Sequence, residues 1–344
     1  MTREEEERRL IIVLAKALGT SSQYRKILTY YPNLKSAIGD KFTLLPASRL
    51  RSKLEKIQWQ ADPRSAFAEC TYLDANYPPV FRDLSEPPLA FWYAGNTDLL
   101  GKQNRLSIVG SRKITPLTTR YLHEVIPQFV RVNLVTVSGL AYGVDACVHE
   151  LTLKNDGKTI GVLGNGLDQK SFSPKTLFTL AQEIISCQGL ILSEYPEGTL
   201  GARHTFPRRN RLVAALSPVT LVAQAAQKSG SLITAKRALE MQRIVVSPSV
   251  EYFTPSFAGN RELIAAGARV SVTGEDIVQA YPELTRAPAL FPAHSKPSGQ
   301  EEVNLEQLCL RFGLPEKTAL SRLTELELSG KITETSPGKW LILE

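Results

Sequence analysis

The chain has 344 residues, of which 43% are hydrophobic and 22% charged, and this composition is typical of a globular protein with about two or three domains. Its formal net charge of +7 favours a polyanionic partner, although many enzymes are equally basic. The cysteines form no C-x-x-C pair and the apolar run near the amino terminus is short, so we expect no zinc knuckle, no signal peptide and no membrane span, and place the protein in the cytoplasm.

The first 75 residues are predicted to form a small helical domain. Apolar residues recur at helical spacing in three segments, 10–18, 24–31 and 47–57. No strand pattern is visible in this part of the sequence. The following segment, 76–95, is rich in proline, which disfavours regular helix, and we expect it to be extended and to lead into the next domain.

From Leu106 onward, short apolar runs alternate with stretches that fit helices. The runs end in glycine, serine or a polar turn and lie at 106–110, 135–139, 159–164, 189–195, 219–224, 243–248 and 268–272. The helical stretches include 116–130, 174–187 and 231–241. Strands that are apolar on both faces and alternate with helices predict a mainly parallel sheet, and therefore an α/β domain over 76–284.

The end of the chain has a different composition. Residues 285–300 contain three prolines and little periodicity, and are predicted to be a linker. Residues 301–344 show two helical patterns around "FGLP", followed by a hairpin that turns at 336–338. Helix, turn, helix and hairpin together predict a small winged-helix domain.

Three glycine-bearing turns follow predicted strands. In a parallel sheet, ligands collect at the carboxyl ends of the strands, where helix amino termini present free N–H groups. The residues of these turns are Gly110, Ser111 and Arg112, then Ser138 and Gly139, and then Ser229, Gly230 and Ser231. A glycine after a strand is often only structural. Three such turns on one edge nevertheless favour an anion-binding site.

Residues 203–211, "RHTFPRRNR", carry four arginines and a histidine between two apolar segments. We expect this cationic cluster to overhang the same edge; the alternative is a solvated basic loop. Lys170 and Lys228 are further candidates on charge alone. Phe206 could stack on a base, although core packing is equally compatible with its position.

The identity of the anion follows from what the turns lack. The closest approach to a dinucleotide-binding turn, "GNGLDQ", has glutamine in place of the last glycine, and no P-loop is present. Several anion sites along one edge suit the backbone of a single-stranded nucleic acid better.

Asp145 and His149 lie four apart on a predicted helix and could be an acid–base couple or metal ligands, but a structural hydrogen bond is the commoner outcome. No third ligand lies at metal spacing, and we expect no metal, no cofactor and no catalytic residue.

A set of motifs in this order resembles the DNA-processing protein A family, also called Smf: "IVGSR", "VSGLAYGVDACVH", "GVLGNGLD", "LSEYPEG", "FPRRNRLVAALS", "SGSLITAKRALE" and "GNRELIAAGA". The resemblance implies an extended Rossmann-like domain that binds single-stranded DNA in a basic pocket. Carried over by position, the DNA contacts that it implies are Ser111, Arg112, Ser138, Gly139, Arg208, Asn210, Arg211, Ser229, Gly230 and Ser231. It also implies a SAM-like helical domain over 1–75, a winged helix over 301–344, and a homodimer formed through the Rossmann-like domain. The function implied is non-enzymatic: protection of incoming DNA and loading of the RecA recombinase during natural transformation.

The sequence departs from the family pattern at Gln224, where the family usually has a glutamate. The alternative function, a Rossmann-like hydrolase that cleaves the N-glycosidic bond of nucleoside monophosphates, is disfavoured by the same residue. Such enzymes pair a Pro-Gly-Gly-x-Gly-Thr turn with a glutamate, whereas this chain has "SGS" and Gln224. A third possibility is that the carboxy-terminal segment reads duplex DNA, but its second predicted helix is close to neutral in charge.

Overall fold

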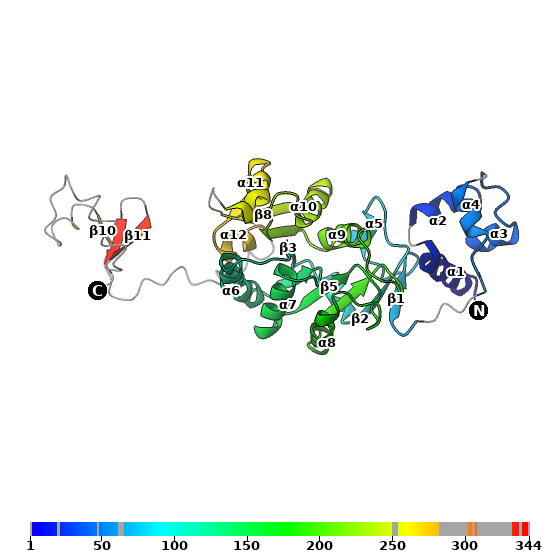
Figure 1. The fold of residues 1–344 in the computed structure, drawn as a ribbon, viewed down its shortest axis with the longest axis horizontal. Coiled ribbons are helices and arrows are strands. Elements are labelled where there is room, and N and C mark those ends of the chain that lie inside the picture. Colours follow the sequence, from blue (N-terminus) through cyan, green and yellow to red (C-terminus); the bar gives the residue numbers. More distant parts are fainter. Residues whose placement is uncertain are drawn as a thin grey trace. The chain divides into compact units, whose positions relative to one another are not determined.

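The computed structural model describes residues 2–18, 21–46, 48–60, 65–249, 254–281, 302–304, 307, 332–336 and 339–342. The chain divides into two compact units, Met1–Arg286 and Ala287–Glu344. Figure 1 shows the larger unit as helices arranged around a twisted sheet. Among the helices of the described ranges, none has the length and the apolar composition that crossing a bilayer requires.

The larger unit is built on a nine-stranded sheet in the order β1-β2-β6-β5-β4-β3-β7-β8-β9. Its strands are β1 (Ala68–Thr71), β2 (Ala90–Gly95), β3 (Arg105–Gly110), β4 (Val135–Ser138), β5 (Thr159–Leu163), β6 (Leu190–Ser193), β7 (Val219–Gln224), β8 (Ile244–Pro248) and β9 (Arg269–Ser271). Strands β3 to β9 pair in parallel, whereas β1 and β2 are antiparallel at one edge. The predicted mainly parallel α/β fold is confirmed, and all seven predicted strands are present.

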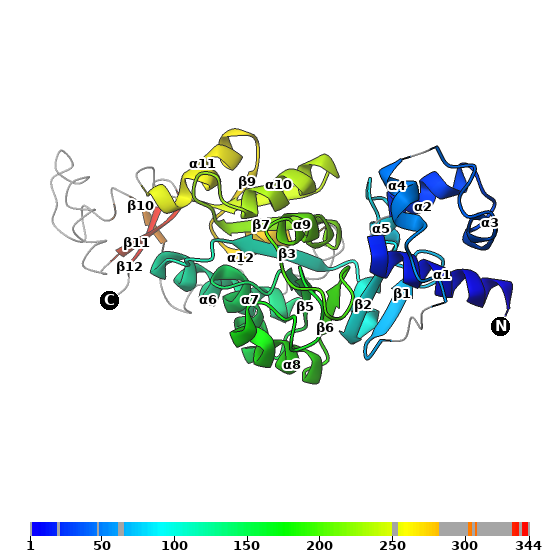
Figure 2. The same ribbon diagram turned by 45° about the vertical axis from the view of Figure 1, so that its right-hand side comes forward.

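Helices cover both faces of this sheet, as Figure 2 shows. On one side lie α6 (Pro116–Arg131), α7 (Val144–Lys154) and α8 (Phe178–Ser186), which is preceded by η2 (Lys175–Leu177). On the other side lie α5 (Pro79–Arg82), α9 (Thr205–Ala215), α10 (Ser231–Glu240) and α11 (Ala258–Ala265). The remaining elements are η1 (Thr97–Gly101), η3 (Pro255–Phe257) and α12 (Gly274–Val278). Because both faces are covered, the central strands are almost wholly buried, which explains why apolar residues predominate in them.

The strand order reverses at β3. The chain passes from β3 through β4 and β5 to β6 on one side, and then crosses to β7, β8 and β9 on the other. In a sheet of this kind the loops that leave the two adjacent strands at the reversal diverge to opposite faces and open a crevice at their carboxyl ends. The loops after β3 and β7 therefore frame the place where a ligand is expected.

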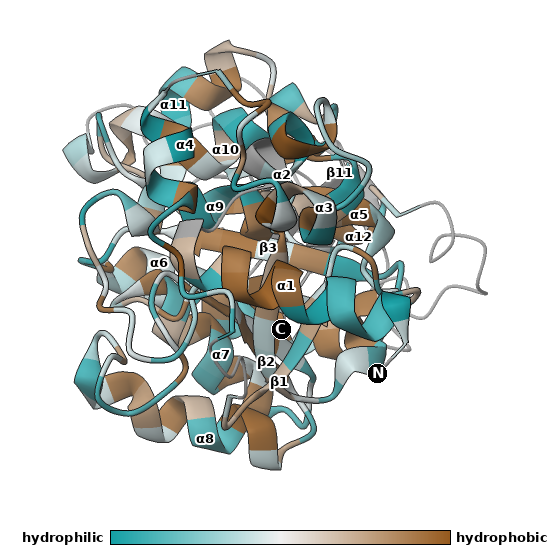
Figure 3. Cartoon of the chain, turned by 90° about the vertical axis from the view of Figure 1, so that its right-hand side faces the viewer, coloured by the Kyte–Doolittle hydropathy of each residue, from teal (hydrophilic) through white to brown (hydrophobic). Residues whose placement is uncertain are grey.

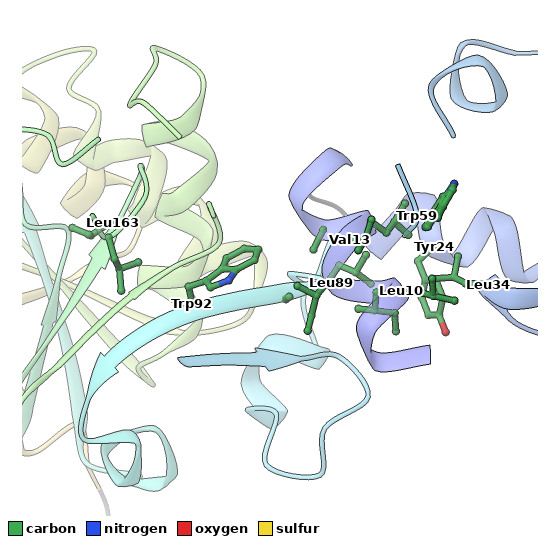
Figure 4. Packing of buried hydrophobic residues seen from close by; sticks show 14 of the residues in the cluster. Leu10, Val13, Tyr24, Leu34, Trp59, Leu89, Trp92 and Leu163 are labelled. Atoms are coloured by element: carbon green, nitrogen blue, oxygen red, sulfur yellow. The ribbon is translucent and has the colours of Figure 1, made fainter. Parts of the chain in front are cut away.

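The first helices are α1 (Arg3–Leu18), α2 (Ser21–Leu28), α3 (Leu34–Gly39) and α4 (Arg49–Leu54). Figure 3 shows the apolar middle of α1, and Figure 4 shows Leu10 and Val13 of this helix beside Leu89. The Arg8 side chain also ties α1 to the sheet edge, because its Nε donates to Asp74 at 3.0 Å and its Nη2 donates to the Glu69 carbonyl at 3.1 Å. The helices and the sheet therefore share one core.

Two strands were not expected from the sequence. The absence of strand in the first 75 residues is wrong at β1, and β2 lies inside the segment that was predicted only to be extended. The two pair with each other, with Cys70 opposite Phe91. Strand β1 is short and half polar, so the rest of the sheet, rather than its own pattern, decides its conformation.

In the smaller unit, a three-stranded sheet has the order β10-β12-β11, formed by Glu302–Asn304, Lys339–Ile342 and Ile332–Ser336. Strands β11 and β12 pair antiparallel on either side of the predicted turn. The predicted linker at 285–300 and the two expected helices lie outside the described residues, so the winged helix stays a prediction.

Candidate functional site

A cavity of about 540 Å³ lies at the carboxyl ends of β3 and β7, where the strand order reverses. Its walls come from the loop after β3, the loop after β4, the start of α9 with its preceding loop, and the start of α10. Seven of the sequence-predicted residues line it: Gly110, Ser111, Arg112, Asn210, Ser229, Gly230 and Ser231. Turns that lie far apart in the sequence, from Gly110 to Ser231, are thus brought to one cavity.

The loop after β3 carries an arginine to the rim of this cavity. Gly110 is packed so closely that a Cβ atom there would lie 2.6 Å from Val144 Cγ2. Ser111 Oγ donates to the Lys113 carbonyl at 3.0 Å and accepts from the Lys113 amide at 3.1 Å, which fixes the turn. Arg112 is exposed, and its Cζ lies 5.4 Å from the centroid of the Phe206 ring in a cation–π contact.

Gln224, at the end of β7, supports the same loop from below. Its Oε1 accepts from the Thr115 amide and from Thr118 Oγ1, both at 2.9 Å. Its Nε2 donates to the Lys113 carbonyl at 3.0 Å. A carboxylate could accept the first two hydrogen bonds but could not donate the third, so an amide at this position makes a contact that the glutamate usual in the family could not make.

The floor of the cavity contains a buried guanidinium. The Nη1 of Arg209 donates to the carbonyl oxygens of Gly139 and Val162, and its Nε donates to Asn210 Oδ1 at 3.2 Å. A Cβ atom on Gly139 would lie 2.5 Å from Arg209 Nη2 and 2.6 Å from Asp145 Oδ2, so glycine is needed between the two charges. Burial lowers the pKa of Arg209 to about 10, with Asp145 acting in the opposite direction, and the guanidinium is therefore charged at neutral pH.

Asp145 and His149 do not form an acid–base couple. Asp145 accepts from the Gly139 amide at 3.2 Å, whereas His149 Nδ1 lies 2.7 Å from Thr159 Oγ1. Burial raises the pKa of Asp145, and burial together with the positive charge of Arg209 lowers the pKa of His149 to about 3. Both side chains hold α7 against the sheet, and the ranges that the structure describes contain no cluster of ligands suited to a metal ion.

Two of the predicted turn residues lie behind the cavity. Ser138 is buried, and its Oγ donates to the Ile108 carbonyl at 2.7 Å, which links β4 to β3. Gly139 is covered by Arg209. Their glycine–serine pattern therefore reflects close packing beneath the cavity, and neither residue lines it.

The cationic cluster at 203–211 is largely helical, and its arginines go to different places. Arg203 and Arg209 line the cavity. Arg208 Nη2 and Arg211 Nη2 instead contact Glu194 Oε1, at 3.1 Å and 2.5 Å. Arg208 and Arg211 therefore do not line the cavity, because a spacing of three residues places both on the helix face that meets Glu194. That either of them contacts DNA stays a prediction.

The exposed lysines Lys170 and Lys228 are not part of the cavity lining. Asn210 does line it, and its Nδ2 donates to the Gly230 carbonyl at 3.4 Å, which joins α9 to the start of α10. Ser229 Oγ and Ser231 Oγ lie 2.8 Å apart at the same helix start.

The cavity is suited to an anion. Its charged lining consists of three guanidinium groups, those of Arg112, Arg203 and Arg209, and of one carboxylate, Asp145. Helix α10 begins beside Gly230, and the helix dipole adds positive potential there, although the Leu232 and Ile233 amides already donate to the Ser229 and Gly230 carbonyls at 3.1 Å and 3.2 Å. The sequence did not single out Arg203 and Arg209 as lining residues. The signal that could have found them is the helical spacing of four between Phe206 and Asn210, which line the same cavity.

Known proteins are similar to this chain in sequence and in fold. The profile of the family described as DNA recombination-mediator protein A matches residues 69–282. The DNA processing protein DprA of Streptococcus pneumoniae is 38% identical over 215 residues, which cover 62% of this chain and 74% of that protein. The protein Smf of Escherichia coli is 30% identical over 279 residues, which cover 76% and 74% of the two chains.

Two solved structures have the same fold. The crystal structure of DNA processing protein A from S. pneumoniae superposes with a TM-score of 0.68 at 33% identity and covers 78% of this chain and 95% of that one. A structure of DNA processing protein A from Helicobacter pylori, described by its single-stranded DNA binding mode, gives a TM-score of 0.55 at 30% identity, with 62% and 95% covered.

Proposed function

Because the chain belongs to the DNA recombination-mediator protein A family, we propose that it binds single-stranded DNA in the cavity at the reversal of the strand order. The observation that carries this proposal is the convergence of three arginines and the start of α10 on one cavity. The H. pylori relative, which has the same fold, is described by its single-stranded DNA binding mode.

The chemistry of the lining suggests how a strand would be held. Arg112 and Arg203 lie at the rim and would contact phosphates, while the buried Arg209 supplies a fixed positive charge beneath them. The Phe206 ring offers a face on which a base can stack. A volume of about 540 Å³ suits one or a few nucleotide units of a single strand and is too small for a duplex.

The finer roles that the family implies are part of the same proposal. The protein would protect incoming DNA and load the RecA recombinase during natural transformation, in the cytoplasm and without enzymatic activity. The described lining of the cavity contains no glutamate, the acid that the alternative hydrolase would pair with its turn, and this disfavours that alternative. A homodimer through the Rossmann-like domain is supported by Val270 and Val272, which are exposed at the edge strand β9 and directly after it.

Fluorescence anisotropy with a labelled oligothymidylate tests DNA binding. We expect tight, salt-dependent binding that is weaker for duplex. Arg112→Ala should lower the affinity by about five- to tenfold and reduce the salt slope by about one unit. Arg120→Ala, which removes an exposed arginine that is paired with Glu124 on α6, is the matched control and should change neither. Equal affinity for duplex and single strand, or an unchanged Arg112→Ala variant, would contradict the proposal.

The recombinase is tested separately. Strand exchange by RecA on DNA that is coated with a single-strand binding protein should start sooner when this protein is added. If the start is not accelerated although the protein binds the strand, recombinase loading is wrong while DNA binding stands.

A further inference from the structure

We propose that Tyr142 is a second base-stacking contact, which extends the binding site from the cavity along the bound strand towards η2. This inference rests on the proposed function, because the ligand is again single-stranded DNA. Neither the sequence motifs nor the cavity lining assigns a role to this side chain.

Tyr142 is unusual in its exposure. The aromatic side chains of the described residues are buried or half-buried with two exceptions, Tyr30 and Tyr142. Tyr142 leaves 49% of its surface accessible. A large aromatic side chain gains little stability in such a position, since the hydrophobic free energy depends on the area removed from water.

The ring of Tyr142 is nevertheless held in place. Its hydroxyl lies 3.0 Å from Thr176 Oγ1 in a hydrogen bond that joins the loop after β4 to η2. A side chain that is fixed before the ligand arrives loses less conformational entropy on binding than a free one. The exposed ring is therefore a preorganised surface for stacking.

The loop that carries Tyr142 contacts η2 through Thr176 and also adjoins the cavity. Ala141 is part of the cavity lining, and the Val144 amide donates to the Ser111 carbonyl at 3.1 Å. Gly143 has a φ of +78°, and a Cβ atom there would lie 2.3 Å from the Ser111 carbonyl oxygen and 2.7 Å from that of Arg112. The loop and the arginine turn are thus in backbone contact, and Tyr142 is the residue next to that contact.

Positive charges lie on both sides of this aromatic residue. Arg112 and Lys113 are exposed on the turn that the loop touches, and Lys175 is exposed next to Thr176. Aromatic rings interleaved with cations are the arrangement by which proteins bind single strands without reading their sequence, since the cations hold phosphates and the rings hold bases. A strand that leaves the cavity past Arg112 would meet the Tyr142 ring next.

The test compares variants of the full chain by fluorescence anisotropy with an oligothymidylate of about 15 nucleotides. Tyr142→Ala should lower the affinity about five- to tenfold, because a stacked base is lost. Tyr142→Phe keeps the ring and should stay within about twofold of the unaltered protein. Tyr30→Ala removes the other exposed aromatic side chain and should leave the affinity unchanged.

A second measurement reports the contact directly. An oligonucleotide that carries 5-iodouracil should crosslink on irradiation to the peptide that contains Tyr142, and the Tyr142→Ala variant should lose this crosslink. Unchanged affinity of Tyr142→Ala together with no crosslink at this peptide would overturn the inference while leaving DNA binding in the cavity intact. If the unaltered protein binds no single strand at all, the proposed function itself is overturned, and this inference with it.

Discussion

Replacing Glu194 by alanine should make the protein markedly less stable, although Glu194 lies outside the cavity. The carboxylate follows β6 and is 2% exposed, and its Oε1 accepts from both Arg208 Nη2 and Arg211 Nη2. Without it, two guanidinium groups on α9 lose their common partner. Arg211 would then keep a buried charge, because its side chain is only 9% exposed.

The size of the effect follows from the burial of the two arginines. Removing one partner of a buried ion pair costs about 3–5 kcal/mol, since an uncompensated charge is left in the interior. The Arg208 side chain is 28% exposed, so water can replace part of its contact with the carboxylate. We therefore expect a loss near the lower limit, about 3 kcal/mol in the free energy of unfolding.

Urea denaturation followed by tryptophan fluorescence measures this difference. Glu124→Ala is the matched control, because Glu124 also pairs with an arginine, Arg120, but on the exposed surface of α6, where such a pair contributes less than about 0.5 kcal/mol. Arg211→Ala should likewise lower stability and leave the DNA affinity of the folded protein unchanged. Equal midpoints for Glu194→Ala and Glu124→Ala would refute the reasoning.

Three further changes test the positions beneath the cavity. Burial lowers the pKa of His149 from 6.5 to about 3, so the folded state disfavours the protonated imidazole. The stabilising contribution of the neutral His149 is complete above pH 6.5 and is lost as the pH falls towards 3, by about 1.4 kcal/mol per pH unit. His149→Gln should flatten this pH dependence of the free energy of unfolding in urea denaturation. Gln224→Glu should weaken oligonucleotide binding several-fold at neutral pH in anisotropy titrations, because a carboxylate cannot donate the hydrogen bond that fixes the arginine turn. Gly139→Ala should lower the free energy of unfolding by about 1–3 kcal/mol, since its Cβ would meet Arg209 Nη2 at 2.5 Å, whereas Gly39→Ala has open space and should not.

The parallel part of the sheet could be predicted because burial on both faces makes apolar residues predominate in its strands. The run at 106–110, for example, becomes β3, which is buried from Arg105 to Val109. Strand β1 could not be predicted in this way, since it has four residues, two of them not buried, and depends on its pairing with β2. Long-range pairing decides such edge strands, and a local pattern does not contain it.

The glycine turns of the site could be predicted from their position after strands, because the fold itself brings the carboxyl ends of parallel strands together. The contacts of each arginine could not be predicted. The density of arginines along the sequence indicated one cationic cluster at the sheet edge, but the helical repeat places Arg208 and Arg211 on the face that meets Glu194 and Arg209 under the cavity. Their partner Glu194 is supplied by the end of another strand, which no local spacing reveals.

Helix α9 thus uses its arginines for two separate purposes, and this explains why so dense a cluster lies between two buried strands. One face neutralises Glu194 and fastens the helix to the sheet. The other places Arg209 below the cavity, where the Gly139 carbonyl accepts one of its hydrogen bonds. Because the desolvation of this guanidinium is partly offset by Asp145, its pKa stays at about 10 and its positive charge is in place before any phosphate arrives. Binding then requires no reorganisation of the floor, and the exposed arginines at the rim are left to adapt to the strand.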